Sequence, residues 1–102
     1  MESQIVIQEI CHSIIYSDQS VMQMFKRNIQ LSEVQLVLNS GIIIQNYPDD
    51  KPFPSSLILG FADGKPIHLV VAFNKLEASC IIVTAYHPDQ KIWDKDFKKK
   101  IN

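Results

Sequence analysis

The sequence has few cysteines and glycines, no long apolar run and almost no net charge. Its 102 residues include two cysteines and three glycines, and ten basic side chains nearly balance eleven acidic ones. Neither Cys11 nor Cys80 belongs to a CxxC pair, which argues strongly against a zinc site built on thiolates. The near-neutral charge argues against a protein that coats nucleic acid by bulk attraction.

No segment has the composition of a membrane span or a secretion signal. The longest apolar runs, residues 69–73 and 80–83, are far shorter than the roughly 18 residues that a span requires. The first residues lack a basic stretch and a small-residue cleavage site, so we expect no signal peptide. We therefore expect a cytoplasmic protein without a membrane partner, whose two cysteines are buried and reduced.

The apolar content is sufficient for a folded core. Hydrophobic residues make up 46% of the chain and charged residues 21%, which is typical of a globular domain. We expect a single domain over residues 1–102, with a helical part at 1–40, a sheet at 41–86 and a C-terminal helix at 90–100.

Apolar residues at helical spacing predict three helices in the first forty residues. The first covers residues 3–16, and the second begins among the N-cap candidates of residues 17–20. The third begins at Ser32, where Gln35 completes a capping box, and ends at Gly41. The side chains expected to face the core are Val21, Met24 and Phe25 in the second helix and Val34, Val37 and Leu38 in the third.

Four β-branched or alternating segments follow and predict strands at residues 42–45, 57–61, 67–73 and 81–86. A tight turn at Asp63-Gly64 joins the second strand to the third. Residues 90–100 can form a short helix. The expected fold class is therefore α+β, with N-terminal helices followed by a three- or four-stranded antiparallel sheet and a C-terminal helix.

Two strands place polar side chains at one end of this sheet. If Val70 lies opposite Thr84, then His68 lies opposite Tyr86, and these two side chains form a polar patch with Thr84. Imidazole exchanges protons near neutral pH, so His68 is the best single candidate for acid/base chemistry. The alternative is a histidine that is satisfied within the sheet beside a half-buried tyrosine.

Several motifs together resemble an uncharacterised bacterial domain family. They are the strand of residues 66–72, the strand and turn of residues 81–89, and Trp93 followed by Asp96-Phe97. The proline-rich loop of residues 46–55 and the helix start around Ile29 and Ser32 also fit. The resemblance covers roughly residues 17–100.

The resemblance implies a RelE-like fold of the RelE and barnase-like ribonuclease superfamily. Members are placed among the toxins of bacterial toxin–antitoxin pairs, and their inferred activity is RNA cleavage without a metal or other cofactor. A cognate antitoxin protein and RNA are the implied partners. Two positions depart from the family pattern, because Gln19 stands where the family usually has histidine and Gln23 where it usually has arginine. Glutamine can position a phosphate oxygen but cannot exchange a proton near neutral pH.

The implied site contains His68, Tyr86, Arg27, Thr84 and Gln19. Tyr86 would orient the reacting RNA or donate a proton to it. Arg27 would stabilise the phosphate charge, and Thr84 would bind a phosphate oxygen. The alternative for Arg27 is a solvated helix cation. Trp93 and Phe97, four residues apart, fit packing of the last helix, and stacking of Trp93 on a base is the other interpretation.

Basic charge is concentrated at the C-terminus. Residues 91–102 hold five lysines and two aspartates, whereas residues 1–90 hold five basic and nine acidic side chains. Candidate RNA contacts are Lys51, Lys98, Lys99 and Lys100. A solvated helix end is an equally good interpretation of the three consecutive lysines.

The sequence favours an endoribonuclease toxin and leaves a second interpretation open. The replacements at Gln19 and Gln23 suit a binding module that holds an antitoxin-like protein or RNA without cleavage. The RNA target, the antitoxin and the oligomeric state are not specified by the sequence.

Overall fold

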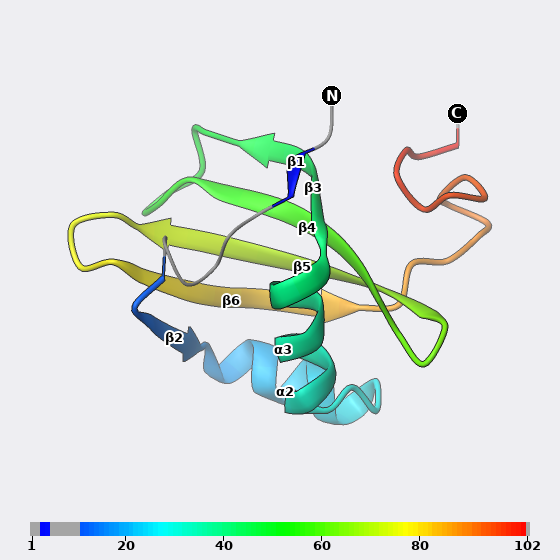
Figure 1. Cartoon of the computed structure of the whole chain (residues 1–102), viewed down its shortest axis with the longest axis horizontal. Helices are drawn as coiled ribbons and strands as arrows, with labels where there is room; N and C mark the ends of the chain where they lie inside the picture. Colours follow the sequence, from blue (N-terminus) through cyan, green and yellow to red (C-terminus); the bar gives the residue numbers. More distant parts are fainter. Residues whose placement is uncertain (1–2, 5–10, 102) are drawn as a thin grey trace.

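The computed structural model describes residues 3–4 and 11–101, which form two helices and a six-stranded sheet (Figure 1). The helices are α2 (Asp18–Lys26) and α3 (Leu31–Ser40). The strands are β1 (Ser3–Gln4), β2 (Ser13–Tyr16), β3 (Ile42–Tyr47), β4 (Ser55–Ala62), β5 (Lys65–Asn74) and β6 (Ser79–Tyr86), in the spatial order β1-β3-β4-β5-β6-β2.

The sheet is mixed, which corrects the expected antiparallel sheet of three or four strands. Strands β3 to β6 form an antiparallel meander, and their ranges include the four segments expected from alternation. β2 is added beside β6 in the parallel direction, and the short β1 pairs antiparallel with β3. The sequence-based prediction was wrong because it assigned both outer strands to a helix.

The N-terminal helix predicted for residues 3–16 is not present in the described part of that range. Its start is β1 and its end is β2, while residues 5–10 lie outside the described residues. Ile14 lies opposite Cys80 and Tyr16 opposite Ile82, so the β6 edge supplies the hydrogen bonds that make this segment extended. The spacing of apolar residues in so short a run suits a helix and a strand equally well, and pairing with β6 decides in favour of the strand.

The C-terminal helix predicted for residues 90–100 is also absent. These residues form turns, with an isolated bridge between Trp93 and Lys100. The Asp94 carboxylate accepts hydrogen bonds from the backbone N–H groups of Asp96 and Lys98, at 3.1 and 3.2 Å. Aspartate side chains that bind nearby backbone in this way compete with helix formation. Residues 89–101 are called the C-terminal segment below.

The two helices cover one face of the sheet, as Figure 1 shows for α3 crossing the strands. In α3 the buried side chains are Val34, Val37 and Leu38, as expected. In α2 the buried residues are Ser20 and Met24. Val21 and Phe25, expected in the core, are 47% and 87% exposed.

The two helices begin with different capping side chains. Ser17 caps α2 by accepting a hydrogen bond from the Ser20 N–H, and it also donates to the Ile82 carbonyl of β6. α3 begins one residue before the expected Ser32, because Gln30 and Glu33 form its capping box.

Part of the opposite face of the sheet is also buried, and the C-terminal segment covers His68 there through Trp93 and Phe97. Leu57, Leu59 and Trp93 are each less than 8% exposed, although none belongs to the cluster under the helices. Leu59 lies opposite His68 on the neighbouring strand, so it shares this second face. The C-terminal segment therefore contributes to burial as a helix would, without being one.

The two cysteines are buried, but they are joined in a disulfide and not reduced as expected. Cys11 and Cys80 have Cα atoms 5.4 Å apart, within the usual range for such a bond. The bond ties the residues before β2 to β6. Among the helices that the structure describes, none has the length and apolar composition needed to cross a bilayer.

Candidate functional site

The register expected for His68 and Tyr86 is confirmed. His68 lies opposite Tyr86, and Val70 lies opposite Thr84. The His68 Nδ1 atom is 3.1 Å from the Tyr86 hydroxyl, and its Nε2 atom is 2.7 Å from the Phe97 carbonyl oxygen. A carbonyl can only accept, so Nε2 carries a proton and donates it to Phe97. In the neutral ring Nδ1 then accepts from the Tyr86 hydroxyl.

His68 is enclosed on all sides. The side chain has no exposed surface, and the Trp93 ring meets it edge-on with centroids 4.4 Å apart. Burial lowers the pKa of His68, and the hydrogen bond to Phe97 opposes this effect only in part. Both ring nitrogens are occupied and no path to solvent is open, so this geometry favours the structural interpretation of His68.

Thr84 and Arg27 contact each other on the side of α2. The Arg27 guanidinium donates to the Ala85 carbonyl at 2.7 Å, and its Nη1 atom lies 3.4 Å from the Thr84 hydroxyl. That hydroxyl donates to the side-chain oxygen of Gln23. Burial raises the pKa of the Tyr86 phenol, whereas the nearby Arg27 charge lowers it. Arg27 is thus close enough to Tyr86 for its charge to act on the phenol.

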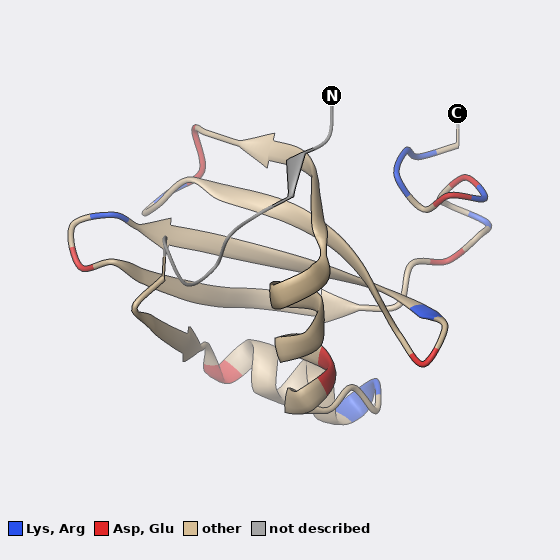
Figure 2. Ribbon diagram, viewed as in Figure 1, with Lys and Arg blue, Asp and Glu red and all other residues tan. Residues whose placement is uncertain are grey.

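The remaining predicted site residues are dispersed. Gln19 is exposed on the first turn of α2, and within the described residues no side-chain hydrogen bond involves it. Lys51 lies in the loop of residues 48–54, at the opposite end of the sheet from the C-terminal segment (Figures 1 and 2). Lys98 is half-buried, whereas Lys99 and Lys100 are exposed. The four lysines therefore do not form one surface.

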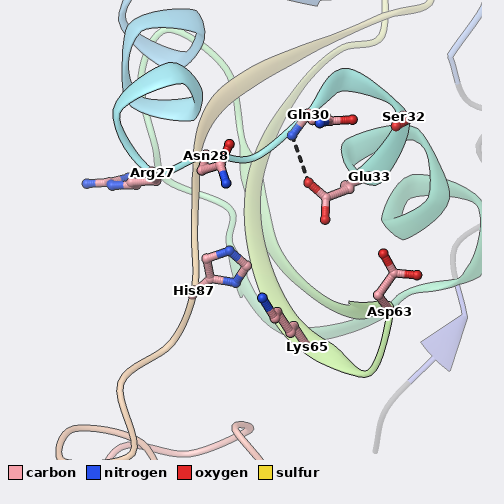
Figure 3. Close-up of a pocket in the computed structure, with 8 residues that line it drawn as sticks. All are labelled: Arg27, Asn28, Gln30, Ser32, Glu33, Asp63, Lys65 and His87. Atoms are coloured by element: carbon pink, nitrogen blue, oxygen red, sulfur yellow. Dashed lines mark hydrogen bonds between the residues drawn. The ribbon is translucent and has the colours of Figure 1, made fainter.

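A polar cavity lies where four elements end. Its volume is about 430 Å³, within the range of ligand-binding pockets. It is bounded by the end of α2, the start of α3, the β4–β5 turn and the residue after β6. The lining residues are Arg27, Asn28, Gln30, Ser32, Glu33, Asp63, Lys65 and His87 (Figure 3).

Local backbone chemistry holds the acidic side of this cavity. The Gln30 N–H donates to the Glu33 carboxylate at 2.8 Å, which fixes that side chain through one of its two oxygens. Asp63 and Gly64 both have positive φ, 52° and 77°, as a two-residue hairpin turn of the primed type requires. This turn brings its own residue Asp63 and the first residue of β5, Lys65, to the rim.

His87 is the titratable side chain at the centre of the cavity. Its Nδ1 atom lies 2.9 Å from the Pro66 carbonyl, which can only accept, so Nδ1 is the protonated nitrogen of the neutral ring. Nε2 is then left with a free lone pair. Figure 3 shows the imidazole and the Lys65 ammonium group on one side of the space, and the carboxylates of Glu33 and Asp63 on the other.

The cavity's charges are not neutralised by one another. In the part of the chain that the structure describes, Glu33, Asp63 and Lys65 form no ion pair. Arg27 is at the rim, with its guanidinium directed away from the centre and held by Ala85 (Figure 3). Lys65 therefore provides an ammonium group and His87 an imidazole inside this cavity, and both face the carboxylates of Glu33 and Asp63.

Sequence reasoning did not assemble this cavity. None of His87, Glu33, Asp63 and Lys65 is among the site residues that the sequence predicts. The only signal within the sequence was the Asp63-Gly64 turn, which places two charged residues at the end of a hairpin. Their approach to His87 and Glu33 depends on how α3 packs across the sheet, which local patterns do not specify.

Comparisons with known proteins identify the chain at the family level. No curated protein and no solved structure matches it. A family model described as "Domain of unknown function (DUF4258)" matches residues 16–87. The matched range includes every residue of the polar cavity and the His68–Tyr86 pair, and it excludes the C-terminal segment. The protein belongs to the DUF4258 family.

Proposed function

We propose that the protein is a metal-independent endoribonuclease, the toxin of a toxin–antitoxin pair, and that the polar cavity is its site. The observation that carries this proposal is the placement of the His87 imidazole and Lys65 opposite Glu33 in one cavity. RNA cleavage by its own 2′-hydroxyl requires a base, an acid and a cation beside the phosphate. All three kinds of group line this cavity.

The reaction assigns one role to each side chain. The free oxygen of Glu33 accepts the proton of the 2′-hydroxyl, whose oxygen forms a bond to the adjacent phosphorus. The bond from phosphorus to the 5′-oxygen breaks, and the doubly protonated form of His87, which carries a proton on Nε2 as well as on Nδ1, donates the Nε2 proton to that leaving oxygen. Lys65 stabilises the added negative charge on the phosphate. The products are a 2′,3′-cyclic phosphate and a 5′-hydroxyl end.

This proposal changes the role of the residues that the resemblance indicated. His68 and Tyr86 hold the C-terminal segment against the sheet, because both polar atoms of His68 face protein partners. Arg27 contributes charge at the rim of the cavity. Gln19 takes no part in proton transfer, so its replacement of a histidine does not remove the acid or the base.

The test is cleavage of an end-labelled single-stranded RNA by the purified protein in the presence of a metal chelator. We expect His87→Ala and Glu33→Gln to lower the single-turnover rate by about 10²- to 10⁴-fold. The matched controls are His12→Ala and Glu77→Gln, exposed residues outside the cavity, which should cleave as wild type does.

Three results would contradict the proposal. The first is intact RNA with the wild-type protein, on both free and ribosome-bound substrates. The second is a His87→Ala protein that cleaves at the wild-type rate. The third is a His68→Gln protein that is as stable as wild type but does not cleave, together with normal cleavage by His87→Ala. This result would place the reaction at the His68–Tyr86 pair.

A non-catalytic binding module is the second candidate function. α2 exposes Val21, Met22 and Phe25, and an apolar helix face of this kind suits a protein partner. An antitoxin-like protein would be that partner. Growth arrest on expression, relieved by the neighbouring gene's product, supports the toxin, whereas a stable complex without toxicity supports the binding module.

A further inference from the structure

A second cavity lies between β4 and the C-terminal segment, beyond the residues used above. Its volume is about 540 Å³. Leu59, Phe61 and Phe97 provide apolar walls, and Lys95, Asp96 and Lys98 provide charged groups. This combination of ring faces and ammonium groups distinguishes it from the purely polar cavity around His87.

The aromatic pair in this cavity is open to an incoming ring. Phe61 is 49% exposed although it lies on the central strand β4. Its ring centroid is 6.5 Å from that of Phe97, with the planes inclined by 70°. An edge-on pair leaves the ring face of at least one partner free, so a flat ligand can stack there.

The wall formed by the C-terminal segment is held in place from the sheet. Phe97 has a φ of +61°, a conformation that a bulky residue rarely adopts. The Phe97 carbonyl accepts a hydrogen bond from His68 Nε2. The Asp94 carboxylate accepts hydrogen bonds from the backbone N–H groups of Asp96 and Lys98, the two residues that flank Phe97. Strained backbone that is fixed by its surroundings is typical of functional sites. His68 is thus a positioning residue for this wall.

Charge also favours an anionic ligand at this place. The last twelve residues hold five lysines and two aspartates, within a chain whose other ninety residues carry more acidic than basic groups. Lys95 and Lys99 are exposed on the C-terminal segment. Figure 2 shows the ribbon of this segment at one end of the molecule, with several blue stretches of lysine between shorter red stretches of aspartate.

We propose that this second cavity is a subsite for single-stranded RNA, in which one unpaired base stacks on Phe61 and Phe97 and the adjoining phosphates contact Lys95 and Lys99. Stacking on aromatic side chains combined with lysine contacts to the backbone is the general way that proteins hold single strands. The Asp96 carboxylate can accept a hydrogen bond from an amino group of the base.

The subsite rests on the proposed ribonuclease function and gives it a substrate class. Phe61 and Asp63 are two residues apart on the β4–β5 hairpin, so the same hairpin lines both cavities. A strand whose phosphate lies beside His87 can pass around this hairpin and place a neighbouring base on Phe61. A paired base is not available for stacking, so single-stranded RNA is preferred over a duplex.

The experiment measures binding of a labelled ten-nucleotide RNA with 2′-O-methyl sugars, which cannot be cleaved, by fluorescence anisotropy. We expect Phe61→Ala to raise the Kd about tenfold and Phe61→Tyr to change it by less than about twofold, because tyrosine keeps the ring. Leu76→Ala removes an apolar side chain that is 99% exposed elsewhere and should bind as wild type does. A Lys95→Ala/Lys99→Ala variant should bind more weakly and with a shallower salt dependence.

Each outcome decides a separate point. Unchanged binding by Phe61→Ala, with cleavage still lost in His87→Ala, overturns the subsite and leaves the proposed function standing. No RNA binding or cleavage by the wild type overturns both. If a polyglutamate peptide displaces the labelled RNA as well as unlabelled single-stranded RNA does, binding depends on charge alone and the proposed base stacking is overturned. If Phe61→Ala does not fold, Phe61→Leu and the lysine variant test the same two contacts.

Discussion

His68 illustrates, at the residue scale, how a titratable side chain becomes part of a core. Its two ring nitrogens are hydrogen-bonded to Tyr86 and Phe97, and the Trp93 ring shields it from water. Burial lowers its pKa, so the folded protein holds the neutral ring. The proton that a histidine usually exchanges with solvent is used here to hold the C-terminal segment.

The lowered pKa of His68 predicts a loss of stability in acid. As the pH falls through about 6.5 the unfolded chain binds a proton at this position, whereas the folded chain does so only at lower pH. Stability should therefore be constant above this range, decrease below it, and level off once the folded form is protonated as well. Urea unfolding at pH 7.5 and pH 5.0 measures the difference. His68→Gln, which can still donate to the Phe97 carbonyl, should show a smaller loss, and equal losses in both proteins would contradict this role.

The junction between α3 and β3 shows, at the scale of elements, why some local predictions were accurate. Gly41 follows α3 as the sequence suggests, but its φ of −77° is available to any residue. It is required because a Cβ atom there would lie 2.5 Å from the Val37 carbonyl oxygen and 2.6 Å from a methyl group of Ile58. The glycine that the sequence suggests as a helix stop is therefore required by the close approach of α3 to the sheet, and not by its backbone conformation.

This geometry predicts that Gly41→Ala is destabilising for a steric reason. We expect a loss of about 1–3 kcal/mol in the free energy of unfolding, because backbone and core atoms must move apart. Gly64→Ala is the matched comparison, since it has a φ of +77° and no atom within 4 Å of the added methyl. It should cost about 1–2 kcal/mol through conformation alone. Chemical denaturation of both variants measures these costs, and a Gly41→Ala protein as stable as wild type would contradict the packing argument.

The elements that were wrongly predicted lack a local determinant. The segment that ends at Tyr16 has apolar residues that suit a helix. It instead pairs with the edge of β6, and Cys11 forms a disulfide with Cys80. In the C-terminal segment, Asp94 captures backbone N–H groups that a helix would otherwise use. In both places a contact outside the periodic pattern changes the lowest-energy backbone.

At the scale of the whole molecule, the disulfide joins the N-terminal region to the far strand of the meander. Cys11 and Cys80 are 69 residues apart in sequence, so the bond closes most of the chain into one loop. A long loop restricts the unfolded chain strongly, which favours the folded state. Disulfides persist in oxidising surroundings, and the cytoplasmic location inferred from the sequence stays a prediction.

Reduction of this bond should lower stability. We expect dithiothreitol to reduce the free energy of unfolding of the wild type by about 2–4 kcal/mol, as is typical for removal of a disulfide. The Cys11→Ala/Cys80→Ala variant should be less stable than the oxidised protein and insensitive to the reductant. A wild-type melting temperature that is the same with and without reductant would show that the bond does not contribute.

The sequence by itself determined the local elements whose signals are short-range. Alternation located the four strands of the meander, the Asp63-Gly64 turn set their hairpin, and the expected register placed His68 opposite Tyr86. The tertiary structure decided the rest: which segment occupies the β6 edge, that the C-terminal segment encloses His68, and that His87 lies in a cavity with Glu33. These outcomes depend on contacts between residues far apart in the chain, whose free energy no local pattern contains.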